Sequence, residues 1–407
     1  MLVIGVGAAG LMSAYSASKN GAEVTVIERN EKPGKKLYIT GKGRCNVTNA
    51  CSVDKFFASV ASNPKFLYGA IHTFSSTDLM TLFEDLGLKL KVERGERVFP
   101  VSDKASDVTN CLYKACLRCG VKFEFSTVVK KIQKENDRFS VYTDKGVFED
   151  YSVIIATGGK SYPSTGSTGD GYDFAKSFGH KIVEPVSALS ALYARNTQDL
   201  AGLSLKNVSA TIVEKNKKIA SQFGEMLFTH EGVSGPIILT LSSLINRKNF
   251  EDLSLQIDLK PALDEKTLND RILRDFAENQ NKKIANVLAL LMPKALISHC
   301  LEQSGINSEK AVNSITKEER IKLIASIKHL TFDLVGLYPL QEAIVTAGGI
   351  NVKEIDPKTM ESKLVEGLYF AGEVIDVDCY TGGFNLQTAF STGYIAGLYA
   401  SKKYTKE

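Results

Sequence analysis

The chain has 407 residues, of which 43% are apolar and 24% are charged, and its formal net charge at pH 7 is +4. This size and composition predict a globular protein with one large core and a second, smaller one. No run approaches the roughly 18 uncharged apolar residues of a membrane span, and the first residues lack the pattern of a signal peptide. We therefore expect a cytoplasmic protein without a membrane partner.

The basic residues are spread along the chain and do not form one patch with interleaved aromatic residues. This dispersion and the weak net charge predict that the protein has no nucleic-acid partner, whereas a small anionic ligand is compatible with both. The seven cysteines lack the spacing of a disulfide framework, which predicts reduced thiols. Cys116 and Cys119 form a CxxC sequence without a second pair of ligands, so we expect no metal site.

The N-terminus carries a dinucleotide fingerprint in its full context. A short apolar strand at residues 2–4 leads into GVGAAG at residues 5–10, which is followed by a helical stretch and a second strand at residues 23–27. Gly5 makes the tight turn, Gly7 lets the backbone approach a pyrophosphate at the positive end of the helix, and Gly10 allows close packing of helix and strand. Glu28, eighteen residues after Gly10, is placed to bind the hydroxyls of an adenosine ribose.

The next segment, KKLYITGKGRCNVTN at residues 35–49, is basic and rich in glycine. Its glycines and β-branched residues disfavour a helix, and it lacks the alternation of a strand. We therefore predict a loop whose backbone approaches an anionic ligand closely.

Two later segments indicate a flavin nucleotide and not a nicotinamide nucleotide. Residues 121–155 read as a run of short strands that closes on Ala156, Thr157 and Gly158. Residues 367–387 read as a strand, a Gly-Glu pair and a glycine-rich turn, and an apolar helix follows to about residue 400. Such a helix directs its N–H groups at the negative charge that develops on a reduced flavin.

An insertion separates the two halves of this domain. Residues 189–259 have the pattern of strands, and residues 268–327 have helical periodicity. We expect the insertion to cover the flavin and to supply the substrate pocket.

The motifs together resemble the BaiN/RdsA-like NAD(P)/FAD-dependent oxidoreductases, a family that includes aminoacetone oxidase family FAD-binding enzymes. The resemblance runs from end to end and is carried by residues 5–10, 34–49, 158–171, 227–236, 345–350 and 370–387. It implies an α/β fold: a two-dinucleotide-binding Rossmann-type FAD domain (1–188 and 340–407), a β-barrel-like insertion (189–262) and a helical insertion (263–339).

The resemblance also implies a set of FAD-binding residues. Lys35, Lys36 and Arg44 would lie near the phosphates and the ribose, and backbone N–H groups of residues 40–43 would lie near the reactive edge of the isoalloxazine ring. The full expected set is Gly5, Gly7, Ala8, Ala9, Gly10, Glu28, Arg29, Lys35, Lys36, Thr40, Gly41, Lys42, Gly43, Arg44, Val129, Ala156, Thr157, Gly158, Gly372, Glu373, Gly383, Phe384, Asn385 and Leu386. Cys45 and Cys51 are spaced one residue more widely than the redox pair of flavin disulfide reductases, which disfavours that role.

The expected reaction is hydride transfer through flavin N5 to or from a small-molecule substrate. The favoured version is an NAD(P)H-linked reductase of an activated carbon–carbon double bond, such as a steroid enone. The alternatives are a flavin amine oxidase that makes hydrogen peroxide, and a redox or tRNA-modification partner protein. Tyr380 and His230 are the candidate proton donors. No second nucleotide fingerprint occurs, so NAD(P)H would bind transiently, and the sequence does not define the oligomeric state.

Overall fold

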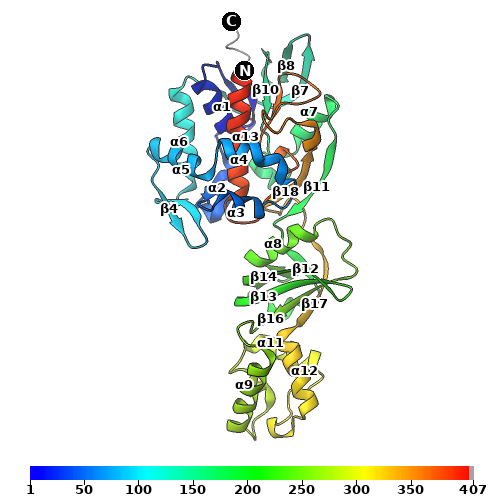
Figure 1. The fold of residues 1–407 in the computed structure, drawn as a ribbon. Helices are drawn as coiled ribbons and strands as arrows, with labels where there is room; N and C mark the ends of the chain where they lie inside the picture. Colours follow the sequence, from blue (N-terminus) through cyan, green and yellow to red (C-terminus); the bar gives the residue numbers. More distant parts are fainter. Residues whose placement is uncertain (403–407) are drawn as a thin grey trace. The chain divides into compact units, whose positions relative to one another are not determined.

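The computed structural model describes residues 1–402, which divide into two compact units (Figure 1). The first unit comprises Met1–Ala188 together with the chain from Pro339 onward. The second unit comprises Leu189–Tyr338. The interruption of the first unit by the second confirms the α/β domain with an insertion that the sequence predicts.

A five-stranded parallel sheet forms the centre of the first unit. Its order is β19 (Leu368–Phe370), β10 (Val153–Ile155), β1 (Leu2–Ile4), β2 (Thr25–Ile27) and β6 (Lys122–Glu124). The strands β1, β10 and β19 are buried at every residue, because both faces of the sheet are covered. The next strand in the chain, β2, lies on one side of β1, and the later strand β10 lies on its other side. The strand order therefore reverses at β1.

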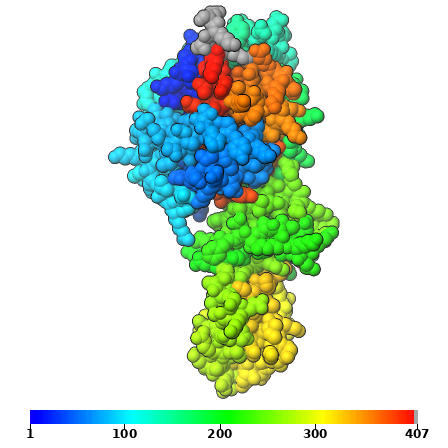
Figure 2. Space-filling model, viewed as in Figure 1, coloured from blue at the N-terminus to red at the C-terminus, as the bar shows by residue number. Residues whose placement is uncertain are grey.

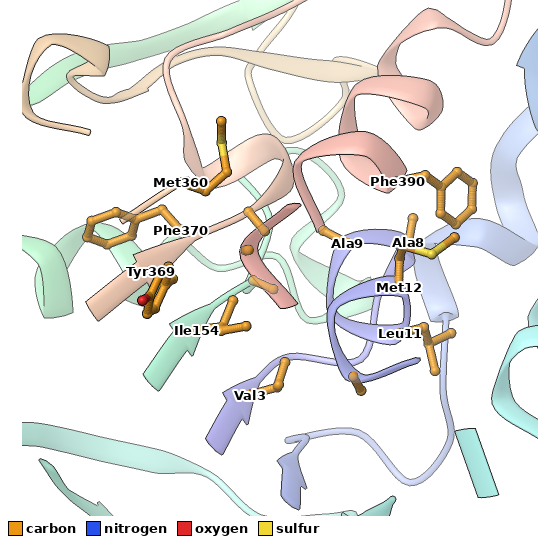
Figure 3. Packing of buried hydrophobic residues seen from close by; sticks show 14 of the residues in the cluster. Val3, Ala8, Ala9, Leu11, Met12, Ile154, Met360, Tyr369, Phe370 and Phe390 are labelled. Carbon is orange, nitrogen blue, oxygen red and sulfur yellow. The ribbon is translucent and has the colours of Figure 1, made fainter. Parts of the chain in front are cut away.

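Helices α1 (Ala8–Lys19) and α13 (Phe384–Ser401) pack closely against each other on this sheet (Figure 3). A Cβ on Gly393 would lie 2.5 Å from the Ala9 carbonyl oxygen, and one on Gly397 would lie 2.2 Å from that of Ser13. Only glycine therefore permits this backbone approach. Figure 3 shows Phe390 of α13 beside Ala8 and Met12 of α1. Helix α6 (Ala105–Arg118) also contacts α1.

Smaller elements complete the first unit. The sheets are β3 (Thr48–Asn49) with β5 (Arg97–Pro100) and β4 (Leu90–Glu93); β7 (Val129–Glu135) with β8 (Arg138–Thr143) and β9 (Val147–Asp150); and β11 (Ile182–Ala188) with β18 (Val345–Ile350). The remaining helices are α2 (Lys35–Ile39), α3 (Val53–Ala58), α4 (Tyr68–Thr73), α5 (Ser76–Asp85) and α7 (Asp170–Ser177). In the space-filling view the β4–β5 hairpin projects from the surface of this unit (Figure 2).

Helix α2 corrects the expectation of a loop over the whole basic segment. Residues 35–39 form this short helix because Leu37 is buried on its inner side, where α2 packs against α6. The expected irregular backbone follows it. Gly41, Lys42, Gly43 and Cys45 all have a left-handed φ, between +56° and +84°.

The second unit contains a closed barrel and a group of helices. The barrel order is β12 (Leu192–Ala194), β15 (Gly232–Ser234), β14 (Lys217–Phe228), β13 (Ser204–Glu214), β16 (Leu253–Asp258) and β17 (Leu330–Leu337). The helices are α8 (Pro236–Ile245), α9 (Glu265–Glu278), α10 (Ile284–Leu288), α11 (Lys294–Ser304) and α12 (Lys317–Lys328). One hydrophobic core joins barrel and helices.

Two of these elements differ from the predicted pattern of the insertion. Strand β17 lies in the range 263–339 that we expected to be helical, and it pairs with β12 and β16 within the barrel. Helix α8 lies in the range 189–262 that we expected to be strands, and its apolar residues Ile237, Ile238 and Leu241 are buried together. The division of the insertion at residue 262 stays a prediction. Within residues 1–402, no helix combines the length and the apolar character needed to cross a bilayer.

Candidate functional site

The carboxyl ends of four parallel strands meet at one edge of the sheet in the first unit. Gly5 follows β1, Glu28 follows β2, Ala156 follows β10 and Ala371 follows β19. The Gly5 amide donates to the Ile27 carbonyl at 2.9 Å, which joins the ends of β1 and β2. Ligands of open α/β sheets bind at such a point, where the strand order reverses.

The three fingerprint glycines meet different surroundings. A Cβ on Gly5 would lie 2.6 Å from the Ala156 carbonyl oxygen, and a Cβ on Gly10 would lie 2.0 Å from that of Gly5. No protein atom lies within 4 Å of a Cβ built on Gly7. Gly7 is the N-cap of α1, and neither a capping side chain nor an acidic residue occupies the first turn. The structure thus leaves open space and free N–H groups where a pyrophosphate would bind.

Glu28 is buried at the end of β2 and organises the neighbouring backbone. Its Oε2 accepts from the Val6 amide at 2.8 Å, and its Oε1 accepts from the backbone and side-chain N–H groups of Asn30. Burial raises the pKa of Glu28, although these hydrogen bonds oppose the shift. The Glu28 carbonyl accepts from the Thr127 amide, which brings the start of β7, with Val129, to this edge of the sheet.

Arg29 fixes the segment that follows β10. Its guanidinium group pairs with Asp170 at 3.0 Å and also donates to Thr168. The Asn30 side chain donates to the Thr165 carbonyl at 3.0 Å. The segment 158–171, which follows β10, is therefore attached to the end of β2.

One carboxylate, that of Glu373, joins four distant segments of the first unit. Its Oε2 pairs with the Lys36 ammonium group at 2.6 Å, and its Oε1 accepts from the Thr346 amide at 2.8 Å and the Ser161 hydroxyl at 3.1 Å. Lys36 also donates to Ser161 at 2.6 Å. We call Lys36, Ser161, Thr346 and Glu373 the Glu373 clasp. Sequence reasoning placed Lys36 and Glu373 at the site but did not pair them.

The other two expected phosphate ligands have protein partners in this structure. Lys35 pairs with Glu31 at 2.9 Å, and Arg44 pairs with Glu93 and Asp103. Phosphate contacts by Lys35, Lys36 and Arg44 stay predictions, because each charge is already balanced within the chain.

The glycine-rich turn before α13 rests on β3. A Cβ on Gly383 would lie 2.4 Å from the Thr48 carbonyl oxygen, and Asn49 donates through Nδ2 to the Gly382 carbonyl at 3.1 Å. Asn385 holds the turn by accepting from the Cys379 amide at 2.9 Å. The first turn of α13, with Phe384 and Leu386, has neither a capping side chain nor an acidic residue. The stretch around residue 40 and the C-terminal segment thus meet.

Helix α1, near the start of the chain, contacts the segment that follows β19. A Cβ on Gly372 would lie 2.7 Å from that of Ala9, the second residue of α1. The structure therefore brings together the fingerprint, the segment after β2 and the segment before α13, as the sequence predicts.

Within residues 1–402, several buried polar side-chain atoms of this unit have no hydrogen-bond partner, among them Asn46 Oδ1, Thr157 Oγ1 and the Tyr172 hydroxyl group. Such groups are rare in folded proteins unless a ligand or water satisfies them. Thr157 belongs to the expected cofactor set, but Asn46 and Tyr172 do not. The signal for Asn46 was its place within the basic segment 35–49, which we expected to approach a ligand. The open space at Gly7 and the first turn of α1, which has no acidic residue, fit the pyrophosphate of a dinucleotide such as FAD.

The two candidate proton donors lie in different units. Tyr380 of the first unit is half-buried, and its amide donates to the Ser59 carbonyl at 2.8 Å. Burial raises the pKa of its phenol, and the negative charge of Asp378 adds to the shift. His230 of the second unit is exposed just after β14. Neither role has an observation that tests it, so both stay predictions.

Cys45 and Cys116 have the properties of structural residues. Cys45 has no exposed surface, and burial raises the pKa of its thiol to about 11. Burial likewise raises the pKa of Cys116 to about 12. Reactive cysteines need the opposite properties, namely a lowered thiol pKa and exposure to solvent. In residues 1–402 no cluster of three His, Cys, Asp or Glu side chains is arranged to hold a metal ion.

Comparison with known proteins identifies relatives along the whole chain. The family described as HI0933-like protein Rossmann domain matches residues 1–399. The ribosomal RNA dihydrouridine synthase of Haemophilus influenzae is 31% identical over 410 residues, which cover 99% of this chain and 98% of that protein. The 3-dehydro-bile acid delta(4,6)-reductase of Clostridium scindens is 30% identical over 407 residues, which cover 98% of each. The ribosomal RNA dihydrouridine synthase of Escherichia coli is 30% identical over 396 residues, which cover 97% of this chain and 96% of that protein.

Solved structures show the same fold at low identity. The 3-ketosteroid delta1-dehydrogenase from Sterolibacterium denitrificans has a TM-score of 0.54 at 12% identity, and the match covers 99% of both chains. The quinol fumarate reductase of Escherichia coli has a TM-score of 0.51 at 17% identity, with coverage of 100% of this chain and 70% of that one.

Proposed function

Because the chain belongs to the HI0933-like family of flavin-dependent oxidoreductases, we propose that it reduces a carbon–carbon double bond conjugated to a carbonyl group. The observation that supports a bound flavin most strongly is that the first turns of α1 and α13 have neither a capping side chain nor an acidic residue. When bound, FAD supplies the hydride from N5 of its reduced isoalloxazine ring.

The names of the relatives support this reaction class. Dihydrouridine differs from uridine by reduction of the C5–C6 double bond, which is conjugated to the C4 carbonyl. A delta(4,6)-reductase of a 3-dehydro-bile acid acts on double bonds conjugated to the C3 carbonyl. Both reactions add a hydride to the electron-poor end of a double bond conjugated to a carbonyl, and a proton then completes the reduction. None of the three relatives described above carries the name of an amine oxidase, which leaves the oxidase alternative without support here.

The names of the relatives also bear on whether this protein binds RNA. Two of them are named ribosomal RNA dihydrouridine synthases, so the expectation that this chain has no nucleic-acid partner is unsupported. A uracil base and a steroid enone are the two substrate classes that the reaction proposed here admits.

In this proposal each group of residues has its own role. The first turn of α1 binds the pyrophosphate, and Glu28 accepts from ribose hydroxyls. The first turn of α13, which has no acidic residue, would provide N–H groups to a bound flavin and would stabilise the negative charge of its reduced form. Tyr380 donates the proton, because it lies directly before the glycine turn that precedes α13 and a phenol is protonated at neutral pH.

Replacing Tyr380 with phenylalanine tests the proton donor. We expect FAD content to stay unchanged and the rate of substrate reduction to fall by about 100-fold, within the range for loss of a general acid. Stopped-flow oxidation of the reduced enzyme by substrate measures this rate. His230→Gln is the matched comparison, and turnover unaffected by Tyr380→Phe would remove Tyr380 from the mechanism.

An anaerobic half-reaction tests the reductase itself. The FAD-loaded protein is reduced with NADH or NADPH and then mixed with a uridine-containing RNA, with a 3-oxo-4-ene steroid, or with an aliphatic amine as control. We expect bleaching by a nicotinamide and recovery of the yellow colour with one of the two conjugated substrates. Bleaching of the oxidised protein by the amine, with no response to either substrate, would contradict the proposal.

A further inference from the structure

A basic surface that the sequence does not reveal forms on the β4–β5 hairpin. In the register of this hairpin Lys91 lies opposite Phe99 and Glu93 lies opposite Arg97, so these side chains share one face. The segment after α2 packs on the same face. A Cβ on Gly41 would lie 3.3 Å from the Phe99 ring, and the Arg44 guanidinium group lies 4.1 Å from the ring centroid.

Residues distant in sequence thus contribute charges to one surface, which we call the Phe99 face. Its cations are Arg44, Lys91 and Arg97, with Lys42 in the segment that packs on this face and Arg94 in the turn of the hairpin. Its carboxylates are those of Glu93 and Asp103, and both are engaged by Arg44 and Lys91.

Three cations on this face or next to it in the chain do not take part in these ion pairs. Lys42, Arg94 and Arg97 are exposed, and within residues 1–402 none of them has an ion-pair partner. Arg97 donates through Nε to the Arg94 carbonyl at 3.1 Å and lies 5.8 Å from the centroid of the Phe99 ring, so its guanidinium group is held on this face. An excess of positive charge therefore remains after the internal pairs are counted. Because exposed cations repel each other unless an anion is present, the arrangement suits an extended anionic partner.

We propose that the Phe99 face binds the ribose-phosphate backbone of an RNA substrate, an inference that rests on the reductase function proposed above. The segment 40–44 is shared by the Phe99 face and by the loop expected to border the reactive edge of the flavin. A polyanion held on this face is thereby held beside the reaction site. Among the substrate classes that the reaction admits, only a uracil within RNA is attached to a chain of phosphates, whereas a steroid offers nothing for these cations to bind.

The test measures binding of a fluorescein-labelled oligouridylate by anisotropy to the FAD-loaded protein at several salt concentrations. The variant is Arg94→Ala/Arg97→Ala, and the matched control is Lys217→Ala/Lys218→Ala, which removes two exposed, unpaired lysines from β14. We expect the Arg94→Ala/Arg97→Ala variant to bind about tenfold more weakly and to reduce the slope of log K against log salt by about 1 to 2. The control should bind as the wild type does.

Separate outcomes distinguish failure of this inference from failure of the proposed function. The RNA surface would be overturned if the variant and the control lost affinity equally, or if the wild type bound no RNA. Tighter binding of anionic lipid vesicles than of RNA would also overturn it. Reoxidation of reduced flavin by a free enone should be the same in variant and wild type, because the enone does not contact the Phe99 face. If no conjugated substrate reoxidises the flavin while RNA still binds, the reductase fails and the basic surface stands.

Discussion

Replacing Gly7 with alanine is expected to abolish useful FAD binding without unfolding the protein. The backbone at Gly7 has a φ of −77°, which alanine adopts freely, and no protein atom lies within 4 Å of the added Cβ. The methyl group would occupy space that the pyrophosphate needs at the N-terminus of α1. We expect a loss of affinity of about 100-fold or more, since a clash and weakened hydrogen bonds to a charged group combine. Titration of the apoprotein with FAD, followed by flavin fluorescence, measures it.

Two other glycines serve as controls for this variant. Gly10→Ala puts a Cβ 2.0 Å from the Gly5 carbonyl oxygen, so it should lower the melting temperature of the apoprotein itself. Gly336→Ala in β17 meets only an ordinary contact of 3.8 Å and should change neither stability nor FAD affinity. A Gly7→Ala protein that binds FAD as tightly as the wild type would show that the pyrophosphate lies elsewhere.

The second large effect is expected at the Glu373 clasp. Lys36→Met leaves a carboxylate that still accepts from Ser161 and Thr346 but lacks its cation, and Glu373→Gln removes the charge that Lys36 needs. The two charged side chains are 22% and 21% exposed, so each single change should cost about 1 to 3 kcal/mol of unfolding free energy, less than for a fully buried pair. FAD affinity should fall as well, because four segments around the site lose their common anchor.

A double-mutant cycle separates the pair from its surroundings. The Lys36→Met/Glu373→Gln double variant should be less destabilised than the sum of the singles by about 1 kcal/mol. The same cycle on Lys283 and Glu309, an exposed pair of the second unit, should show coupling of about 0.5 kcal/mol or less. Additive single effects at Lys36 and Glu373 would mean that the clasp does not hold the site together.

The sequence predicts best those features that are local. The strand, glycines, helix and acidic terminus of the fingerprint lie within the first 28 residues, and each is specified by its own short pattern. The turn before α13 is equally local, because Gly382 and Gly383 take left-handed backbone that glycine favours. These patterns sufficed to predict that distant segments share one ligand, because strands of a parallel sheet end at the same edge.

Features that depend on pairing between distant residues were not accessible. Nothing near Lys36 indicates that its partner is Glu373, and nothing near Arg44 indicates Glu93 and Asp103. The Phe99 face is an example of such a feature. Its cations come from residues 42–44 and 91–97, so the basic residues look dispersed in the sequence although the structure brings these two segments together.

Errors in the insertion have a different cause. Strand β17 follows directly on α12, and its alternating burial from Leu330 onward is a strand signal that the preceding helical pattern concealed. Helix α8 was hidden by neighbouring strands. Its signals were Pro236 at the first helical turn and apolar residues at helical spacing.

The most direct test of the account is the amount of FAD that the wild-type protein holds. Purified protein is incubated with FAD, passed through a desalting column and measured by visible absorbance, with Gly7→Ala in parallel. One flavin per wild-type chain and none in Gly7→Ala is the result that we predict. A wild-type protein that stays colourless would contradict the site, and with it the reductase function and the role of the Phe99 face.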